Sequence, residues 1–125
     1  MKPRVLLVED DADIRVLFGL AFREAGFSVQ EATDGLEAIA ALQLDIFDAI
    51  VLDLSMPRVD GVSALDTFKI MRNGADVPVI TVTALDDPAI EKRALEGGAA
   101  VFLRKPVTPQ QIVDAVREQI AIRGK

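Results

Sequence analysis

Short runs of apolar residues alternate along this chain with longer segments in which apolar residues recur at helical intervals. Three runs are almost entirely apolar or β-branched: Val5–Val8, Ala49–Leu54 and Val79–Val82. Ser28–Ala32 and Ala100–Leu103 are two further candidate strands with a weaker pattern. Strands that are apolar on both faces are typical of a parallel sheet covered by helices on each side.

Each candidate strand is followed by a segment of helical period with recognisable ends. The first segment stops at Gly26, and the last begins with Thr108-Pro109, a typical N-cap and first-turn pair. The predicted helices cover Asp13–Ala25, Gly35–Leu44, Val62–Met71, Pro88–Glu96 and Thr108–Ile122. Strict alternation of strands with helices implies right-handed crossovers. We therefore predict an α/β, flavodoxin-like doubly wound fold whose five-stranded parallel sheet has the order 2-1-3-4-5.

The length of the chain, 125 residues, favours one domain. No repeat, low-complexity run or linker-like segment divides it, so we place the domain at residues 1–122 and expect the tail 123–125 to fray. The N-terminal apolar run Val5–Val8 is too short for a signal peptide or a membrane span. We therefore expect a cytoplasmic protein.

Composition excludes several kinds of chemistry. The chain has no Cys and no His, so disulfides, thiolate or imidazole metal sites and His-dependent nucleophiles are ruled out. Its 14 Lys and Arg against 20 Asp and Glu give a formal net charge of −6, and the basic residues are scattered. Since an acidic surface repels phosphate backbones and anionic lipids, we expect no direct nucleic-acid or membrane partner.

Polar side chains stand where four of the predicted strands end. Ligands of doubly wound sheets bind beyond the carboxyl ends of the strands, near the point where the strand order reverses. We expect these side chains to meet in one crevice there, with Asp11 or Asp13 serving mainly to cap the first helix. They are Glu9, Asp10 and Asp11 after the first strand, Asp53 in the third, Thr83 after the fourth and Lys105 after the fifth.

Carboxylates that meet in such a crevice require a counter-charge. Two unit charges ~5 Å apart, about the spacing of neighbouring strands, repel by roughly 3 kcal/mol at an effective dielectric constant near 20. A hard divalent cation with oxygen ligands, Mg²⁺, relieves this repulsion. The hydroxyl of Thr83 and the long side chain of Lys105 can reach a group bound on Asp53. Such a site suits phosphoryl transfer to Asp53, which would form an acyl phosphate.

Five short motifs, in their order along the chain, resemble one known family. They are Val5-Leu-Leu-Val-Glu-Asp10, Val51-Leu-Asp53 with Met56-Pro57, Asp60-Gly61, Thr81-Val-Thr83-Ala84 and Phe102-Leu-Arg-Lys105-Pro106. Over essentially its whole length the chain resembles the receiver domain of bacterial two-component response regulators, of the chemotaxis-regulator-like kind. The resemblance implies a phosphorelay phosphoprotein that signals rather than an enzyme, with an output domain or protein partner that the sequence does not name.

The resemblance also implies roles for the acidic residues. Asp53 would accept a phosphoryl group from a histidine kinase or a histidine phosphotransfer protein in a magnesium-dependent reaction. Asp10, Asp53 and the backbone carbonyl of Ser55 would bind Mg²⁺, and Glu9 would act mainly through bound water.

Further implied roles fall on the last two strands. Thr83 and Lys105 would contact the phosphoryl oxygens, and Phe102 would turn inward when Thr83 moves. The Lys105–Pro106 peptide bond is expected to be cis, which proline tolerates.

Two features depart from the family pattern. Ser55 and Leu85 follow the acceptor aspartate and Thr83 by two residues, at positions that tune the lifetime of the phosphoryl group. Because Leu85 cannot orient an attacking water, we expect slow autodephosphorylation. Ala100 and Val101 stand where DNA-binding relatives usually carry acids of a charged dimer face. We therefore expect the face of the fourth and fifth helices to dock an apolar partner surface.

Two other functions remain open, a magnesium-dependent phosphohydrolase with an Asp nucleophile and a flavodoxin-like small-ligand binder. Such hydrolases usually place a second acid two residues after the nucleophile, where this chain has Ser55. The second alternative usually requires a Gly-rich phosphate loop after the first strand, where this chain instead has three acids that would repel a phosphate.

Overall fold

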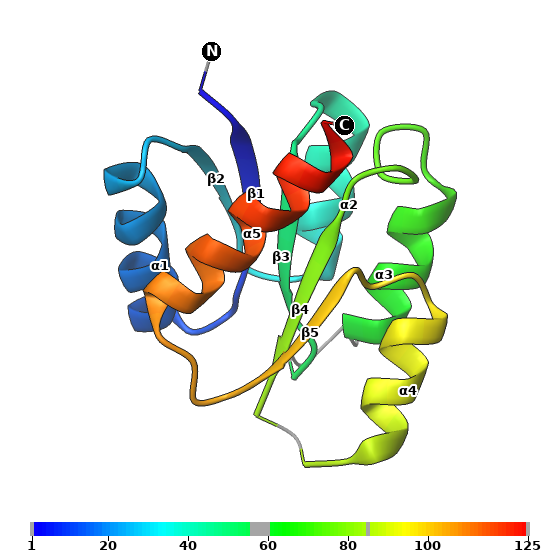
Figure 1. The fold of residues 1–125 in the computed structure, drawn as a ribbon. Helices are drawn as coiled ribbons and strands as arrows, with labels where there is room; N and C mark the ends of the chain where they lie inside the picture. The colour runs from blue at the N-terminus through cyan, green and yellow to red at the C-terminus, as the bar shows by residue number, and fades with distance from the viewer. Residues whose placement is uncertain (1, 56–60, 85, 125) are drawn as a thin grey trace.

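Five parallel strands form one sheet in the computed structural model, which describes residues 2–55, 61–84 and 86–124 (Figure 1). The strand order is β2-β1-β3-β4-β5, and every neighbouring pair is parallel. The predicted flavodoxin-like doubly wound sheet is confirmed. The strands are β1 (Arg4–Val8), β2 (Ser28–Ala32), β3 (Ala49–Asp53), β4 (Val79–Thr83) and β5 (Val101–Arg104). Of the residues in the family-like motifs and loops, Met56, Pro57, Asp60 and Leu85 lie outside the described residues.

The helices connect the strands and form two layers. Figure 1 shows α1 and α5 on one side of the sheet and α2, α3 and α4 on the other. Among the described residues, no helix combines the length and the apolar character needed to cross a membrane. The helices are α1 (Ala12–Glu24), α2 (Gly35–Leu44), α3 (Gly61–Ile70), α4 (Pro88–Glu96) and α5 (Pro109–Arg123).

The three inner strands, β1, β3 and β4, are buried along most of their length because each of their faces meets a separate apolar core. Leu7 of β1 belongs to the core beneath α1 and α5, which also contains Phe22. The preceding residue, Leu6, belongs to the core beneath α2, α3 and α4, which also contains Phe68. Successive side chains of a strand point to opposite faces, so an unbroken apolar run is what a doubly covered strand requires.

Local capping explains where α1 begins and ends. The Asp11 carboxylate accepts hydrogen bonds from the amides of Asp13 and Ile14, at 2.9 and 3.1 Å. This confirms Asp11 as the N-cap and starts the helix one residue before the predicted Asp13. At the other end Gly26 has φ of +94°, a left-handed conformation that favours glycine after a helix.

The C-cap of α4 shifts β5 by one residue from its predicted position. Gly98 has φ of +102°, and the amide of Ala99 donates to the carbonyl of Ala94 at 3.0 Å. The chain therefore completes the helix end at Ala99, and β5 runs over Val101–Arg104 instead of Ala100–Leu103.

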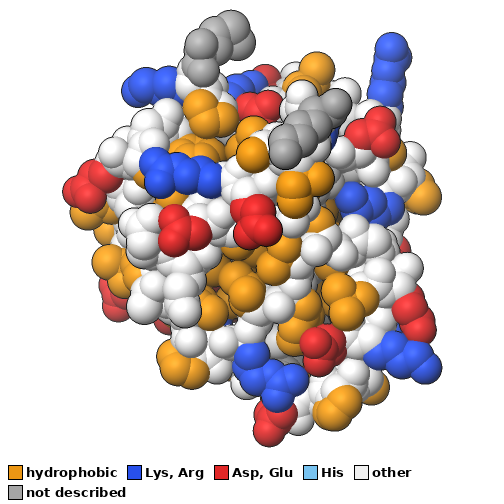
Figure 2. All heavy atoms as spheres, in the orientation of Figure 1, with side chains coloured by type: hydrophobic (Ala, Val, Ile, Leu, Met, Phe, Trp, Pro, Cys, Tyr) orange, Lys and Arg blue, Asp and Glu red, His pale blue; other side chains and the backbone are white. Residues whose placement is uncertain are grey.

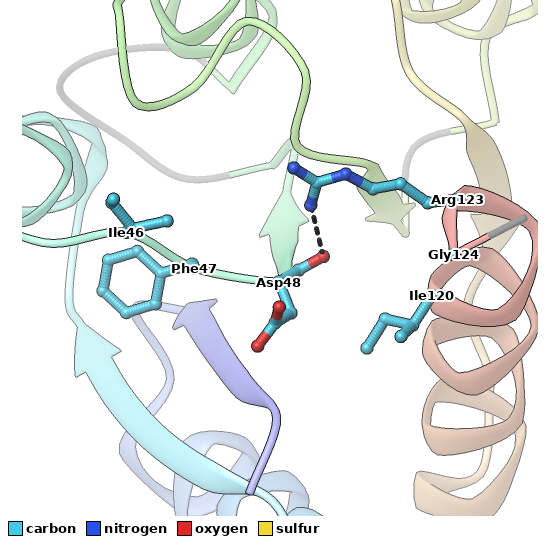
Figure 3. Close-up of a pocket in the computed structure, with 6 residues that line it drawn as sticks. All are labelled: Ile46, Phe47, Asp48, Ile120, Arg123 and Gly124. Atoms are coloured by element: carbon cyan, nitrogen blue, oxygen red, sulfur yellow. Dashed lines mark hydrogen bonds between the residues drawn. The ribbon is translucent and has the colours of Figure 1, made fainter. Parts of the chain in front are cut away.

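The C-terminal turn of α5 packs against the loop before β3 (Figure 3). This loop lies at the end of the sheet opposite Glu9 and Asp53. The helix continues to Arg123, one residue beyond the predicted end at Ile122. The guanidinium of Arg123 donates to the carbonyl of Asp48 at 3.4 Å, so the first residue of the tail that was expected to fray is helical and in contact with the body of the domain. A hollow of about 260 Å³ lies between these segments, lined by Ile46, Phe47, Asp48, Ile120, Arg123 and Gly124.

We expect Phe22→Ala to lower the free energy of unfolding by about 3–5 kcal/mol, because it empties a fully buried site. The Phe22 ring also meets Phe27 edge-on, with their centroids 5.1 Å apart. Leu20→Ala is the matched control on the same helix. Leu20 is 53% exposed, and its truncation should change stability by less than about 0.5 kcal/mol. Urea unfolding of both variants measures the difference, and equal losses would contradict the assigned buried face of α1.

Candidate functional site

The carboxyl ends of β1 and β3 bring three carboxylates together. The strand register pairs Val8 with Leu52, so Glu9 and Asp53 follow as neighbours at the same edge of the sheet. Glu9 is 2% exposed and Asp53 is 4% exposed, whereas Asp10 is open to solvent. One carboxylate oxygen from each of Glu9, Asp10 and Asp53 lies within 4.8 Å of the others. The predicted convergence of these acids is therefore present in the structure.

Lys105 reaches back across the sheet to this acidic cluster. Its ammonium nitrogen lies 3.3 Å from Asp53 Oδ2 and 3.3 Å from Glu9 Oε1. The amide of Lys105 also donates to the carbonyl of Thr83 at 2.8 Å, which joins the ends of β4 and β5. The Lys105–Pro106 bond is cis, as predicted. One cation thus faces two buried carboxylates.

Ser55 binds the other oxygen of Asp53. The Ser55 amide and hydroxyl both donate to Asp53 Oδ1, at 2.9 and 2.6 Å. Neither contact was predicted from the sequence, which assigned Ser55 a carbonyl ligand and a loop position but no hydrogen bond to Asp53. A serine two residues after an aspartate is a sequence signal for such a turn, because short polar side chains hydrogen-bond locally.

The proton affinities of Glu9 and Asp53 differ because their hydrogen-bond partners differ. Burial raises the pKa of Glu9 to about 7, and the neighbouring charge of Asp53 adds to the rise. Burial also opposes ionisation of Asp53, but hydrogen bonds from Ser55 and Glu9 and the charge of Lys105 outweigh it and hold the pKa of Asp53 below its ordinary value. Lys105 is equally close to both acids, but Asp53 accepts two hydrogen bonds from Ser55, whereas Glu9 accepts one, at 3.2 Å, from the amide of Asp11. Asp53 is therefore held as the carboxylate.

Burial alone would lower the pKa of Lys105, but the charges of Asp53 and Glu9 outweigh it and raise that pKa. The ammonium form of Lys105 is therefore held beside the two acids. It can supply a positive charge to any anionic group bound at Asp53.

The donor set fits a hard divalent cation. All three side chains offer carboxylate oxygens, the ligands that Mg²⁺ prefers, and the open side at Asp10 leaves room for the waters that this ion retains. Among the described residues, Lys105 is the one ammonium group within 4.0 Å of Glu9 and Asp53, and with Asp10 beside them the cluster keeps negative charge that a cation would neutralise.

Arg15 contacts the backbone of the site rather than its carboxylates, and it was not identified from the sequence. Its guanidinium donates to the carbonyl of Glu9 at 3.0 Å and lies 3.4 Å from the carbonyl of Asp10. The same side chain pairs with Glu31 of β2 at 3.3 Å and is only 18% exposed. No motif points to it, because its partners are backbone carbonyls and a residue on another strand.

Thr83 and Phe102 lie on the same side of the sheet. Thr83 is fully buried at the end of β4. Phe102 pairs in register with Thr81 and packs, partly buried, against the core beneath α2, α3 and α4. Since residues two apart in a strand share a face, Thr83 and Phe102 are diagonal neighbours on that face.

The outer face of β5 and α5 carries a groove of about 590 Å³ whose lining includes Val101, Leu103 and Ala115. Ala100 is exposed and Val101 half-buried, whereas Ala99 is part of the core beneath the helices. Figure 2 shows apolar side chains gathered on the lower half of the visible face, with Lys and Arg side chains separated by acidic and apolar ones. No continuous basic patch is visible on this face.

We expect Glu9→Gln to remove a loss of stability that the wild type suffers as the pH rises from about 4.5 to about 7. The folded state binds a proton on Glu9 more tightly than the unfolded state, so the contribution of this group to stability is fully present below pH ~4.5, falls as the pH rises toward the folded pKa and stays low above it. In EDTA, the variant should gain roughly 2 kcal/mol over the wild type between pH 5 and pH 8. Chemical unfolding at several pH values measures this, with the exposed Glu118→Gln as control. Identical pH slopes in all three proteins would refute the shift.

Comparison with known proteins places this site in a family. The family model of the response regulator receiver domain matches residues 5–117. The transcriptional regulatory protein PrrA of Mycobacterium tuberculosis is 38% identical over 122 residues, which cover 98% of this chain and 52% of PrrA. The DNA-binding regulator RpaA of Synechocystis is 35% identical over 116 residues, which cover 92% of this chain and 48% of RpaA. The chain thus spans about half the length of these curated relatives.

Solved structures agree with this placement. A receiver domain of a Francisella response regulator is 31% identical, with a TM-score of 0.88, and the match covers 99% of this chain and 100% of that one. The receiver domain of a sensor histidine kinase from Pseudomonas aeruginosa is 27% identical with a TM-score of 0.88, covers 97% of this chain and 99% of that one, and has magnesium coordinated in its active site cleft. With a family model that spans most of its length and a sheet of matching topology, this chain belongs to the response regulator receiver domains, the signalling domains of two-component systems.

Proposed function

We propose that Asp53 is the phosphoacceptor of a phosphorelay and receives its phosphoryl group from a histidine kinase or a histidine phosphotransfer protein. A carboxylate oxygen of Asp53 attacks phosphorus, a P–O bond forms, and the P–N bond to the donor histidine breaks. The departing imidazole takes up a proton and leaves as neutral histidine. The observation that carries the proposal is the buried Asp53 side chain with the Lys105 ammonium 3.3 Å from its Oδ2.

Lys105 and Thr83 would bind the new phosphoryl group. Phosphorylation adds negative charge at Asp53, where Lys105 already lies within reach of both acids. The ammonium can then move from the carboxylates to a phosphoryl oxygen, and the Thr83 hydroxyl can donate from the adjacent strand end. Charge stabilisation of this kind supplies most of the catalysis in phosphoryl transfer.

Mg²⁺ would be held by Asp10, Asp53 and the backbone carbonyl of Ser55, with Glu9 acting through bound water. A bound cation would neutralise the negative charge of the carboxylates and of the incoming phosphoryl oxygens. The chain's own contribution is the arrangement of acids: Glu9 and Asp53 are buried, and Asp10 is exposed at the mouth of the site.

The output would be a change in the face that β4, β5 and α5 present to a partner. If Thr83 moves toward a phosphoryl group, it leaves space on the face that it shares with Phe102, and the half-buried ring can turn into it. The groove beside Val101 and Leu103 lies on the other face of β5, so both surfaces of this edge strand would respond. The groove combines apolar residues such as Val101 and Leu103 with charged ones such as Asp114, so it fits a partner that presents both hydrophobic and polar side chains, whether an output domain or a separate protein.

Neither alternative function gains support from the site. A phosphohydrolase would need an acid where Ser55 instead donates a hydrogen bond to Asp53. A flavin or nucleotide phosphate would meet Glu9 and Asp10 at the end of β1, where a phosphate-binding site needs amide donors or cations.

We expect acetyl phosphate with Mg²⁺ to add the mass of one phosphoryl group to the wild type and none to Asp53→Asn. The amide keeps the shape of the side chain but is not a nucleophile. Intact-mass spectrometry measures the adduct, and Asp114→Asn, an exposed acid on α5, serves as the matched control that should still be labelled. An adduct of equal yield on Asp53→Asn would falsify the assignment of the acceptor.

We expect Mg²⁺ to raise the thermal unfolding midpoint of the wild type and to have a much weaker effect on Asp10→Asn. Losing one of three carboxylates should weaken Mg²⁺ binding by at least about tenfold, because charge and ligand number set affinity for hard cations. Asp11→Asn is the control, since it makes the same change in net charge one residue away and asparagine still caps α1. Equal losses in both variants would contradict a ligand role specific to Asp10. Thermal denaturation across a magnesium series gives both apparent affinities.

A further inference from the structure

The guanidinium of Arg15 hydrogen-bonds to two backbone carbonyls of the loop after β1 that carries Glu9 and Asp10, called here the acidic loop. One terminal nitrogen lies 3.0 Å from the carbonyl of Glu9 and 3.4 Å from the carbonyl of Asp10. We propose that Arg15 is a positioning residue for the metal site: it sets the affinity for Mg²⁺ by holding the loop that carries these two acids. This inference rests on the proposed function only in that Mg²⁺ binds the acidic cluster.

Arg15 is itself paired with a residue of strand β2. Its Nε lies 3.3 Å from Glu31 Oε1, and Glu31 belongs to β2, where it pairs in register with Leu7 of β1. The amide of Glu9 donates to the carbonyl of Ala32 at 3.0 Å, which ties the start of the loop to the same strand. The guanidinium therefore connects the loop to a fixed point in the sheet, and its planar fork suits two partners at once.

The contacts of Arg15 oppose the natural tendency of the loop to open. The carboxylates of Glu9, Asp10 and Asp53 repel one another when no cation lies between them. Asp10 is exposed, so its position near the two buried acids depends largely on the backbone of the loop that carries it. With the carbonyls of Glu9 and Asp10 bound to Arg15 on one side, the loop is held in one conformation before the metal arrives.

The charge of Arg15 and its positioning act on Mg²⁺ in opposite directions. A cation near the loop would repel Mg²⁺, so removing it for electrostatic reasons alone would tighten metal binding. Loss of a positioning contact would instead weaken Mg²⁺ binding, as the loss of an outer-shell partner does at other metal sites. The sign of the change therefore separates the two effects.

Calorimetric titration of Mg²⁺ into the purified full chain tests the proposal with three variants. We expect Arg15→Met to raise the Kd for Mg²⁺ by about tenfold. We expect Arg15→Lys to fall between Arg15→Met and the wild type, because an ammonium keeps the charge but lacks the fork. Arg23→Met is the matched control: Arg23 pairs with the same Glu31, at 3.1 Å, but on the exposed side of α1, and its loss should change the Kd less than about twofold.

A second readout separates positioning from general damage to the fold. In acetyl phosphate labelling, Arg15→Met should need about tenfold more Mg²⁺ for half-maximal rate but reach nearly the wild-type rate at saturation. Arg15→Met with unchanged or tighter Mg²⁺ binding would overturn the proposal, as would equal weakening in Arg23→Met or an Arg15→Lys variant that equals the wild type. A wild type that binds Mg²⁺ but is never labelled would refute the phosphoacceptor assignment and leave this inference standing. A wild type that binds no Mg²⁺ would overturn both.

Discussion

The contact on which the site depends is the ammonium of Lys105 between the carboxylates of Glu9 and Asp53, at 3.3 Å from each. Two almost fully buried acids side by side would be costly in the fold without a nearby cation. One lysine only partly meets that need, because it offers one positive charge to two acids. The crevice therefore keeps a net negative charge. A bound metal ion can neutralise this charge, and a phosphoryl group on Asp53 can draw the Lys105 ammonium toward itself.

This arrangement is possible only because the sheet is parallel and doubly covered. Parallel strands send all their carboxyl ends to one edge, where Glu9, Asp53, Thr83 and Lys105 meet from four different strands. The two apolar cores on either side hold the strands in register. The same burial that stabilises the sheet also excludes water around Asp53, which strengthens every charge interaction there.

The backbone loops around the site add a second level of control. Ser55 donates two hydrogen bonds to one oxygen of Asp53, and Lys105 contacts the other, so the two oxygens of this aspartate differ in their surroundings. Arg15 plays the corresponding part for the loop of Glu9 and Asp10, through carbonyls rather than side chains. Ser55 therefore orients the Asp53 side chain directly, whereas Arg15 acts on the backbone that carries Glu9 and Asp10.

The sequence by itself determined the fold and the identity of the acids, because both follow from regular spacing. Apolar runs predicted the strands, helical periods predicted the helices, and polar residues at strand ends predicted the crevice; only ends such as those of α1 and β5 shifted by a residue, where caps decide the boundary. Only the tertiary structure decided which oxygen of Asp53 each neighbour binds and that Arg15 and Glu31 support the acidic loop. Those contacts join residues through backbone carbonyls or across separate strands, where no periodicity in the sequence records them. Electrostatic balance in the crevice is likewise a property of distances and burial, which a list of residues does not contain.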